Sequence, residues 1–512
     1  MGEIRNILFV TFDQWRGDCL SAMGHPVIKT PVLDALAADG VLFRNHFTNA
    51  APCGPARASL FTGLYPMLHR SVRNGTPLDA RHTNLALEAR KAGYEPVLFG
   101  YTDTSADPRG LNQSDPRLQG YEGLLPGFEE ELRHATAREA WEAWLTRKGH
   151  EFPRAIGFNW LPDRTGMEDE PYAAAPARLA LEDWDTRFMT DRALSYIEGR
   201  GDNPWFVHMS YWPPHPPFVV PAPYNSRYDR KSVVPPHRAA SVEEEAAQHP
   251  WLKYALDNHE RFSWCYGTET IPADISDAEM AQIAATYYGM INEVEDCLGQ
   301  LIDHLKISGQ YDHTLIVLTS DHGEMMGDHW MLGKMGYFDE AFHVPLIIRD
   351  PREGAVRGRQ IKAMTEAVDV APTVLDLLGL AVPRTMHGRS LAPWIKGETP
   401  ADWRDFVMWE YDFRDVRAGK IEQALGLSLE TANLAVLRDQ ASKYVHFAGL
   451  PPLYFDLADD PEERINRADD PAYAPRVLAA AQRLLSHRMS HADRTLTHIT
   501  LDDGYAEAQW AL

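Results

Sequence analysis

The stretch NILFVTFD, residues 6–13, decides the fold class of this 512-residue chain. Its first seven residues, Asn6–Phe12, form a short and almost continuous apolar run, and Asp13 follows directly. Such a run is typical of a strand that is buried on both faces of a parallel sheet. Ligand sites in open parallel sheets gather outside the carboxyl ends of the strands. The stretch therefore predicts a buried parallel strand, with Asp13 at the edge where a site would form.

Three further apolar runs resemble the first one: Pro96–Gly100, Trp205–Met209 and Leu315–Thr319. Helical patterns lie between the runs, and the clearest is Met280–Leu305, whose apolar residues recur at helical spacing. Alternating strands and helices favour a mostly parallel sheet covered on both faces. We therefore predict an α/β fold with one large, mostly parallel sheet covered by helices.

The pattern of apolar runs along the sequence changes after about Pro400. Short strand candidates follow one another closely there, with turn residues between them: Phe406–Tyr411, Asn433–Leu437, Lys443–Phe447 and Leu453–Leu457. This spacing predicts a small antiparallel sheet with one or two helices. We expect a catalytic α/β domain over residues 1–400 and a smaller C-terminal α+β domain with a tail over residues 401–512. Two stretches rich in proline or acidic residues, Pro213–Tyr224 and Ser241–Glu245, are predicted as surface loops.

Composition excludes several classes of partner. The formal net charge of -23 argues against nucleic acid and anionic membranes, because binding to them requires basic patches. No apolar stretch approaches the length of a membrane-spanning helix, and the first residues do not form a signal-peptide core. The four cysteines show neither a zinc-knuckle nor a disulfide spacing. We therefore expect a soluble protein of the reducing cytoplasm. The negative net charge does not exclude a small anionic substrate, whose binding depends on a few local cations.

A second pair of polar residues follows a strand run. Asp321 and His322 come directly after Leu315–Ser320, so they should reach the same edge of the sheet as Asp13. Two carboxylates and an imidazole form a plausible set of ligands for a divalent metal. An aspartate after a strand is also a common turn former or helix cap, and each residue taken alone fits that simpler reading.

The segment PCGPARASLFTG, residues 52–63, predicts a helix that is entered through Gly and Pro and ended by Gly63. Cys53 stands at its amino end, and Arg57 lies four residues on, on nearly the same face. The helix dipole adds positive potential there, which suits an anionic tetrahedral group. The alternative is that Cys53 is a small buried apolar residue, as lone cysteines usually are.

These motifs together resemble a known family. Cys53-Gly54-Pro55-Ala56-Arg57 matches the C-x-P-x-R signal that the formylglycine-generating machinery reads in sulfatases. With FDQ at 12–14 and SDHGE at 320–324, it resembles the catalytic framework of the alkaline phosphatase superfamily. The motifs DQWR at 13–16, GYT at 100–102, PHPPF at 214–218, GK at 333–334 and EYDFRDV at 410–416 are similar to the phosphonate monoester hydrolase and phosphodiesterase branch.

The resemblance implies a sulfatase-like fold, a homo-oligomer that is a tetramer, and one divalent metal per chain. The metal would be held by Asp13, Asp321, His322 and the formylglycine made from Cys53, with Gln14 close by. The imidazole shifts the preference toward manganese, which we favour, iron or zinc, and does not forbid calcium.

The residues that match the family's substrate pocket are Arg57, Asn74, Tyr101, His215 and Lys334. Each also has a simpler interpretation. Asn74 suits a turn, Tyr101 the end of a strand, His215 a loop between prolines, and Lys334 a solvated surface. Their match to one pocket favours the functional interpretation.

Asp103 is the one departure from the family pattern. We expect a hydroxyl residue at this position in the best-known hydrolases of the branch. An added carboxylate near the pocket would repel an anionic substrate, so substrate preference is the part of the prediction that this residue affects most.

The resemblance also implies a mechanism. Hydrated formylglycine carries two hydroxyls on one carbon; one attacks phosphorus or sulfur, and the other drives release of the product. Arg57, Lys334 and the metal offset charge on the nonbridging oxygens, and His215 or Lys334 stabilises or protonates the leaving oxygen.

We expect hydrolysis of phosphonate monoesters and phosphodiesters, with promiscuous hydrolysis of sulfate monoesters, after maturation by a formylglycine-generating enzyme. The nearest alternative is a dedicated arylsulfatase, because both share the signal at Cys53. A more remote alternative is a non-catalytic protein that binds metal and anions through an unmodified Cys53.

Overall fold

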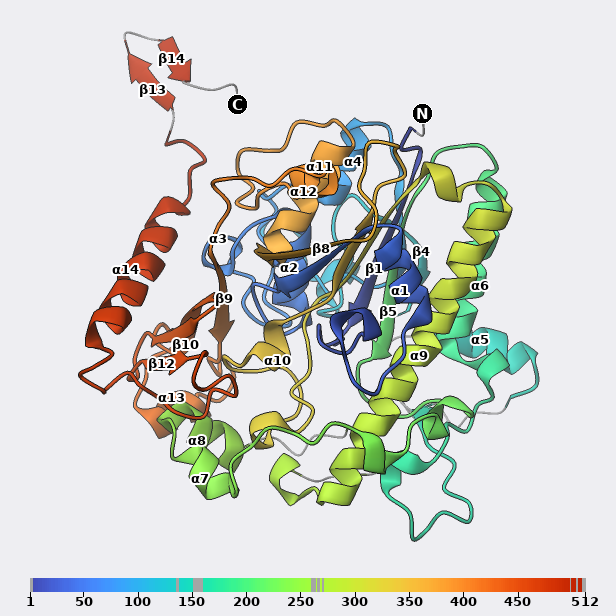
Figure 1. Ribbon diagram of the computed structural model, residues 1–512. Coiled ribbons are helices and arrows are strands. Elements are labelled where there is room, and N and C mark those ends of the chain that lie inside the picture. The colour runs from blue at the N-terminus through green and yellow to red at the C-terminus, as the bar shows by residue number, and fades with distance from the viewer. Residues whose placement is uncertain are drawn as a thin grey trace.

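The computed structural model describes residues 3–134, 138–150, 160–258, 264, 268, 271–497, 499–502 and 505–508. In this part of the chain, eight strands form the central sheet, in the order β4-β3-β5-β1-β6-β7-β2-β8 (Figure 1). Their bounds are β1 Asn6–Asp13, β2 Val41–Phe47, β3 Pro96–Gly100, β4 Glu129–Arg133, β5 Phe206–Pro214, β6 Thr314–Ser320, β7 Leu346–Arg349 and β8 Arg359–Glu366.

Strand β1 lies in the middle of the sheet, between β5 and β6, and is parallel to both. Val10 of β1 is paired with Met209 of β5 on one side and with Leu318 of β6 on the other. Strand β7 runs antiparallel to β6 and to β2, and the remaining pairs are parallel. The predicted large, mostly parallel sheet is therefore confirmed.

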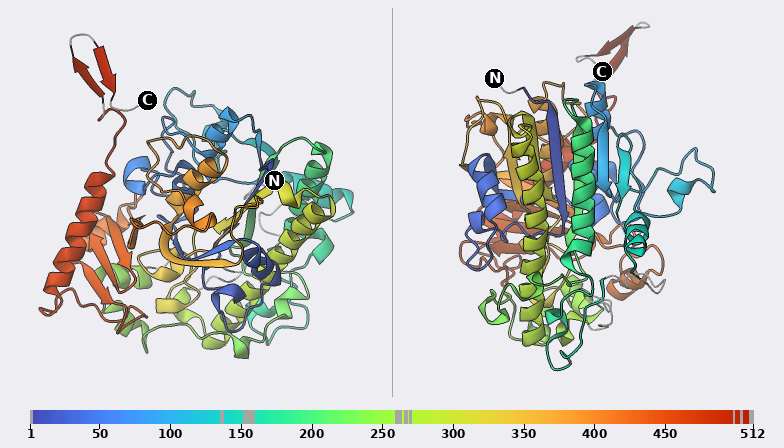
Figure 2. Two further views of the ribbon diagram at one scale, coloured as in Figure 1. Left: turned by 45° about the horizontal axis from the view of Figure 1, so that its top comes forward. Right: turned by 90° about the vertical axis from the view of Figure 1, so that its right-hand side faces the viewer.

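Helices cover both faces of the sheet because successive residues of β1 point to opposite sides. Leu8 and Val10 pack in one core with residues of α1 (Pro31–Ala38), α5 (Glu139–Arg147), α6 (Asp185–Arg200) and the long α9 (Asp277–Ile307). Ile7 and Phe9 pack in a second core with α2 (Cys53–Thr62), α4 (Leu85–Lys91), α11 (Val370–Leu377) and α12 (Ala392–Ile395). Figure 2 shows α6 and α9 lying along the sheet. Helix α9 contains and extends the helix predicted over Met280–Leu305.

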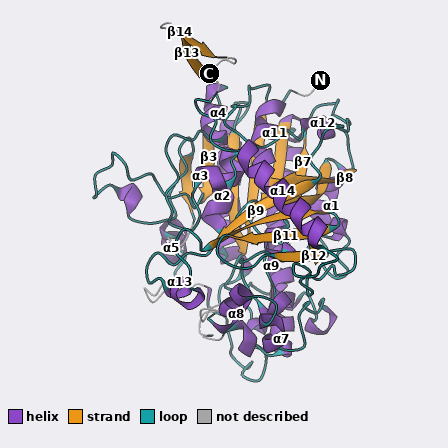
Figure 3. Ribbon diagram, turned by 90° about the vertical axis from the view of Figure 1, so that its left-hand side faces the viewer, coloured by secondary structure: helices purple, strands orange, loops and turns teal. Residues whose placement is uncertain are grey.

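A second, antiparallel sheet follows in the C-terminal part, with the strand order β12-β11-β10-β9. Its strands are β9 Phe406–Asp412, β10 Asn433–Asp439, β11 Ser442–Phe447 and β12 Leu453–Asp456, which confirms the predicted small antiparallel sheet. Helix α14 (Ala474–Ser490) packs Ala480 and Leu484 against this sheet (Figure 3). The boundary at residue 400 between two domains stays a prediction.

The last described segment is a hairpin of β13 (Ile499–Asp502) and β14 (Tyr505–Ala508), which projects away from the rest of the described chain (Figures 1 and 2). The other α-helices are short: α3 Pro66–His69, α7 Val242–Ala246, α8 Pro250–Asp257, α10 Asp339–Phe342 and α13 Lys420–Leu425. Among the described residues, no helix combines the length and the apolar character that crossing a bilayer requires.

Two surface-loop predictions were wrong: Pro213–Tyr224 is mostly loop but buried, and Ser241–Glu245 is mostly helical. In Pro213–Tyr224, the first two residues end β5, and Phe218, Val219 and Val220 are buried in the core beneath α9. This segment is proline-rich, but its apolar side chains have a helix to pack against.

The segment Ser241–Glu245 was predicted as a loop and belongs mostly to α7. Ser241 caps the helix by accepting a hydrogen bond from the backbone N–H of Glu244. Glu245 is buried, and two groups satisfy its carboxylate: His329 Nδ1 lies 2.9 Å from it, and the Ala239 N–H donates to it. The acidic run therefore contains one residue with a structural partner.

Candidate active site

Four neighbouring strands of the central sheet end at one place. The carboxyl ends of β3, β5, β1 and β6 are adjacent in the strand order, and polar residues stand at or just after each of them. Asp13 ends β1, His215 follows β5, Asp321 and His322 follow β6, and Tyr101 follows β3. The residues that the sequence places at strand ends are thus brought together from distant parts of the chain, as expected for an open parallel sheet.

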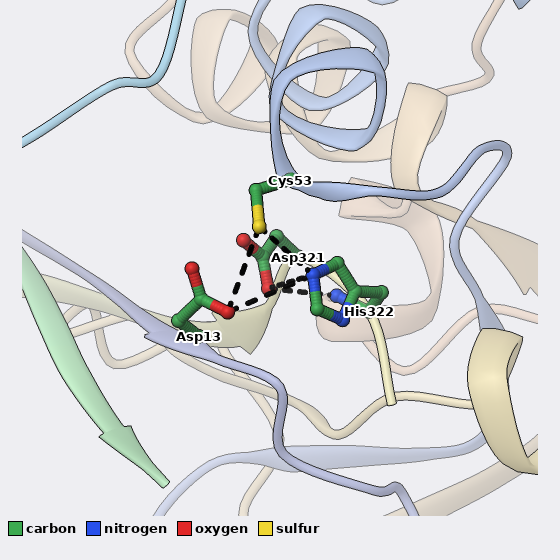
Figure 4. Close-up of side chains that lie close together, drawn as sticks. All are labelled: Asp13, Cys53, Asp321 and His322. Atoms are coloured by element: carbon green, nitrogen blue, oxygen red, sulfur yellow. Dashed lines mark hydrogen bonds and ion pairs between the residues drawn. The ribbon is translucent and has the colours of Figure 1, made fainter. Parts of the chain in front are cut away.

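Helix α2 brings Cys53 to the same place. Cys53 is the first residue of the helix, only 5% of its surface is exposed, and Gly63 ends the helix with a φ of 65°. Figure 4 shows the cysteine side chain pointing from the helix end toward Asp13, Asp321 and His322. The amino end of α2 therefore faces the carboxylate cluster, where the orphan N–H groups of a first helical turn give positive potential.

These four side chains have the geometry of a metal-binding group. One ligand atom from each of Asp13, Cys53, Asp321 and His322 can be chosen so that all lie within 4.8 Å of one another. The Cys53 sulfur lies 3.2 Å from Nε2 of His322 and 3.8 Å from Oδ1 of Asp13. His322 Nδ1 lies 3.0 Å from the Gly323 carbonyl, which can only accept, so Nδ1 carries the proton and Nε2 keeps its lone pair. Two buried carboxylates and a correctly oriented imidazole fit a divalent cation.

Arg57 forms ion pairs with both aspartates of this cluster. Its side chain is fully buried, and its Nε lies 2.9 Å from Oδ2 of Asp321 while one terminal nitrogen lies 3.4 Å from Oδ2 of Asp13. The other terminal nitrogen donates to the Tyr101 carbonyl at 2.8 Å and to Ser210 Oγ at 2.6 Å. The guanidinium is therefore directed at protein acceptors, and its geometry orients both carboxylates.

Gln14 and Lys334 stand beside Asp13. Lys334 Nζ donates to Oε1 of Gln14 at 2.6 Å and lies 3.8 Å from Oδ1 of Asp13. The side-chain nitrogen Nε2 of Gln14 donates to Oε2 of Glu324. The other oxygen of Glu324, Oε1, accepts from the backbone N–H groups of Met326 and Gly333. Glu324 thereby fixes the orientation of the Gln14 amide, and its oxygen stays on the side of Lys334.

His215 and Tyr101 lie on the side of β5 and β3. His215 Nδ1 lies 2.6 Å from the Pro216 carbonyl and therefore donates to it, which leaves Nε2 unprotonated in the neutral ring. The Tyr101 hydroxyl donates to Oδ2 of Asp13, and the Tyr101 ring lies over the Arg57 guanidinium at 4.2 Å. Trp212 contacts both residues, with ring centroids 5.4 Å from Tyr101 and 4.7 Å from His215.

Asn74 and Asp103 approach the site beside Gly54, the residue after Cys53. Oδ1 of Asn74 accepts the Gly54 N–H at 2.9 Å, and the Asp103 carbonyl lies so close to Gly54 that a Cβ there would be 2.9 Å from it. The Asp103 side chain is buried and one of its oxygens has no hydrogen-bond partner among the described residues. All the predicted site residues thus lie around one centre.

The electrostatics of the centre follow from burial and close charges. Burial acts to raise the pKa of Asp13, but neighbouring basic groups, first His215 and Lys334, lower it well below its usual range. Burial lowers the pKa of Lys334, and the acidic groups around it, led by Cys53 and Asp13, raise it above its usual range. Lys334 is therefore a permanent cation near pH 7.

The two histidines and the cysteine respond mainly to burial. Burial lowers the pKa of His215 to about 3, with a further contribution from Lys334, so the ring is neutral near pH 7. Burial also lowers the pKa of His322, which keeps it in the neutral form that metal binding requires. Burial, and then the charge of Asp13, raises the pKa of the Cys53 thiol well above its usual range, so the unmodified sulfur is a weak nucleophile.

Several supporting residues were not singled out from the sequence. They are Glu324, which holds Gln14; Ser210, which accepts from Arg57; Ser320, whose hydroxyl donates to the Phe12 carbonyl; and Tyr287, which donates to the Gln14 carbonyl. Glu324 stands two residues after His322 in the quoted motif, so its position in the sequence offered a signal. Ser210 and Tyr287 lie within a strand and a helix, where the sequence pattern gives none.

The fold and the site together define a class of protein: α/β proteins with a buried metal-ligand cluster at the carboxyl edge of a mostly parallel sheet. The sulfatase family model matches residues 5–380, and a model described as N-sulphoglucosamine sulphohydrolase, C-terminal, matches residues 327–490. The chain therefore belongs to the sulfatase family, within the alkaline phosphatase superfamily. Members of this family are metal-dependent and carry a formylglycine.

Similar proteins match the chain over almost its whole length. The multifunctional alkaline phosphatase superfamily protein PehA of Trinickia caryophylli is 45% identical over 96% of this chain and 97% of its own. The solved structure of a phosphonate monoester hydrolase of Agrobacterium radiobacter has a TM-score of 0.95 and 46% identity, covering 99% of this chain and 100% of its own. The phosphonate monoester hydrolase SpPMH from Silicibacter pomeroyi has a TM-score of 0.92 and 40% identity, covering 98% and 99%. The predicted family resemblance is confirmed.

Proposed function

We propose that this protein hydrolyses phosphonate monoesters and phosphodiesters, and hydrolyses sulfate monoesters as a promiscuous activity. One observation carries the proposal: Cys53, inside the intact maturation signal, stands at the amino end of α2 within 4.8 Å of the ligand atoms of Asp13, Asp321 and His322. Similarity to two phosphonate monoester hydrolases over almost the whole chain supports the choice of substrate.

The nucleophile is a formylglycine made from Cys53 by a formylglycine-generating enzyme. Asp13, Gln14, Asp321, His322 and the modified residue 53 hold one divalent metal, with manganese favoured over calcium, iron and zinc. When bound, the metal acts as a Lewis acid that offsets negative charge on the reacting group. The donor set of two carboxylates and one imidazole supports a transition metal.

The remaining residues have roles that follow from their contacts. Lys334, a buried cation beside Gln14, places positive charge at the nonbridging oxygens and donates a proton or hydrogen bond to the leaving oxygen. Nε2 of His215 is a proton acceptor, because Nδ1 donates to Pro216. Arg57 orients Asp13 and Asp321, and Asn74 and Tyr101 line the approach to residue 53.

The substrate class is tested with one preparation and one panel. Protein matured with a formylglycine-generating enzyme is assayed on nitrophenyl esters of a phosphonate, a phosphodiester and a sulfate at a single pH. We expect the highest kcat/KM for the phosphonate monoester or the phosphodiester, a lower value for the sulfate, and no turnover by Cys53→Ala. Peptide mass spectrometry on the same preparation must find formylglycine at position 53. An active protein that contains only unmodified cysteine would contradict the proposed nucleophile.

Metal removal gives a second prediction. Chelation followed by desalting should abolish turnover and leave the fold intact by circular dichroism, because the ligands lie at strand ends outside the two hydrophobic cores. Manganese should restore activity, and elemental analysis should find one metal ion per chain. Full activity in protein shown to be metal-free would contradict the assignment of Asp13, Asp321 and His322.

A dedicated arylsulfatase is the second candidate. The sulfatase family model covers most of the chain, and an arylsulfatase of Clostridium perfringens is 26% identical over 92% of both chains. A sulfate ester turned over more efficiently than either phosphorus ester in the panel would favour it. A non-catalytic metal- and anion-binding protein is the remote alternative, and turnover of any of the three esters that is lost in Cys53→Ala excludes it.

We also propose a homo-oligomer, in particular a tetramer, that works in the cytoplasm. One face of α14 carries Leu478, Leu485 and Met489, which are 59%, 59% and 71% exposed and lie in line at helical spacing. An apolar stripe of this kind supports association with a second copy of the chain. The described cysteines, Cys19, Cys53 and Cys297, are free and buried, which supports a reducing compartment.

A further inference from the structure

Asp103 is held rigidly at the edge of the site. It lies three residues after the end of β3, in a left-handed conformation with a φ of 52°. The residues on either side are pinned to the same carbonyl, because the Thr102 hydroxyl and the Thr104 N–H both donate to the Gly123 carbonyl, at 2.9 and 3.3 Å. A non-glycine residue in this conformation costs free energy that the surrounding contacts must offset. The backbone position of Asp103 is therefore fixed by the fold.

The Asp103 carboxylate is buried without a matching cation. Only 4% of the surface of Asp103 is exposed, and its Oδ1 has no hydrogen-bond partner in the described part of the chain. Burial raises the pKa of Asp103 to about 7, against the lowering effect of Arg57 and together with the charges of Asp13 and Glu122. Arg57 does not pair with it, since its donors are directed at Asp321, Asp13, Tyr101 and Ser210.

The other carboxylates of the centre differ from Asp103 in this respect. Asp13 accepts from Tyr101 and Arg57, and Asp321 accepts from Arg57 and from the N–H groups of Gln14 and His322. A buried polar oxygen without a partner is destabilising, so a ligand that supplies the missing donor gains free energy by satisfying it. The centre thus has a buried acceptor without a partner in the described part of the chain, and it is close enough to Cys53 for its charge to help raise the pKa of the thiol.

We propose that Asp103 binds an ammonium group of the substrate, so that the preferred esters are zwitterionic: an anionic phosphonate or phosphodiester with a primary amine close to the ester. This inference rests on the proposed function and specifies its substrate class. Lys334 and the metal ligands receive the anionic centre, and Asp103 receives the cation. An ester with both charges matches the two halves of the site, whereas an anion alone is repelled by Asp103.

Two isosteric esters test the proposal. Aminoethyl nitrophenyl phosphate and propyl nitrophenyl phosphate have the same leaving group and differ in one ammonium for one methyl. At one neutral pH, the mature, metal-loaded parent should show a kcat/KM that is about 10- to 100-fold higher for the aminoethyl ester, the range expected for a charged hydrogen bond. In Asp103→Asn, which keeps the shape and removes the charge, the ratio of the two values should fall to near one.

The matched control is Asp107→Asn on the same loop. The Asp107 carboxylate is already satisfied by Arg109 and by the Ala80 N–H, so its removal changes the net charge equally and should leave the ratio as in the parent. Equal ratios in the parent and in Asp103→Asn would overturn the proposal, as would a parent that does not prefer the aminoethyl ester. A loss of preference in Asp107→Asn as large as that in Asp103→Asn would also overturn it, because the effect would then be one of net charge.

Binding measurements test the role of Asp103 independently of the proposed hydrolysis. The Cys53→Ala protein, loaded with metal, lacks the nucleophile and binds both esters without turnover, so calorimetry gives their Kd values directly. Tighter binding of the aminoethyl ester that is lost in Cys53→Ala/Asp103→Asn supports the role of Asp103 even if the mature protein hydrolyses neither ester. That second result would contradict the proposed function alone. Equal Kd values for the two esters would contradict the role of Asp103 alone.

Discussion

At the scale of single residues, Arg57 shows how one side chain serves several purposes. It is fully buried and contacts Asp13, Asp321, the Tyr101 carbonyl and Ser210, which lie on or directly after four different strands. The sequence motif predicted a cation that contacts the substrate. The contacts indicate a positioning residue, because its donors are directed at the protein and it orients the two metal-binding carboxylates.

Replacement of Arg57 should therefore affect the fold as well as activity. Arg57→Ala leaves Asp13 and Asp321 as buried charges without their cation, and we expect the free energy of unfolding to fall by about 3–5 kcal/mol. Urea unfolding of the unmodified protein measures this change. The control is Arg70→Ala, since Arg70 is half exposed and its nearest carboxylate oxygen is 3.9 Å away. We expect a change within about 1 kcal/mol there. Equal stability of Arg57→Ala and the parent would show that Arg57 does not hold the cluster together.

The site residues could be predicted to different degrees. Asp13, Asp321 and His322 could be found because each follows an apolar strand run, and Cys53 because it lies within a contiguous signal. Ser210 could not be found, because its role depends on which strand lies next to β1. That neighbour, β5, is set by tertiary packing and leaves no local pattern.

At the scale of elements, the long strands that are buried throughout were the easiest to predict. Strands β1 and β6 are buried over their whole length, so their residues are nearly all apolar and the runs are easily recognised. Strand β4 was missed because it is an edge strand whose sequence is EEELR, with only Leu132 buried. Strand β2 was missed because Arg44 and Asn45 interrupt its apolar run. Charged edge strands protect a sheet from pairing with other chains, and for the same reason they lack the pattern of a strand.

Helix α14 is attached to the body of the protein by aromatic rings that include three histidines. His487 stacks on His491 at 4.1 Å and contacts Tyr65 at 4.8 Å, and His387 lies 5.1 Å from His491. Burial lowers the pKa of His487 and of His387 to about 3, with contributions from neighbouring basic groups that include Arg404, Arg488, Arg494 and His82. The cluster is therefore neutral in the folded protein.

This cluster predicts a loss of stability in acid. A histidine whose folded-state pKa is lowered binds fewer protons than the unfolded chain between about pH 6.5 and about pH 3, so stability falls as the pH falls through this window. We expect His487→Phe, which keeps an aromatic ring, to reduce the slope of stability against pH between these values. Urea unfolding at a series of pH values measures it. His237→Phe, at an exposed histidine paired with Glu462, makes the same chemical change outside the cluster, so a smaller slope in His487→Phe than in this control assigns the effect to the cluster. Equal slopes in the parent and His487→Phe would exclude this histidine as a contributor.

At the scale of the whole molecule, the exposed face of α14 and the projecting hairpin β13–β14 are the features that a single chain leaves without a partner in the described structure. Leu485→Glu combined with Met489→Glu should shift the assembly toward smaller species, because two buried charges would face an apolar partner surface. Light scattering after size-exclusion chromatography measures the mass. Ile307→Glu is the control, since Ile307 is 88% exposed at the end of α9 and outside the stripe. An unchanged mass for the double variant would place the interface elsewhere.

The position of β1 between β5 and β6 determines when the site can assemble during synthesis of the chain. Cys53 and His322 are 269 residues apart, so the pocket around Cys53 cannot close until most of the chain has been synthesised. At about 5–20 residues per second, the segment around Cys53 precedes its partners out of the ribosome by roughly 15 to 50 s. In the finished protein, the cysteine is almost inaccessible. A maturation enzyme that acts on Cys53, as proposed above, would therefore compete with translation and folding, and any change that slows synthesis between Cys53 and β6 would lengthen the period in which the residue can be modified.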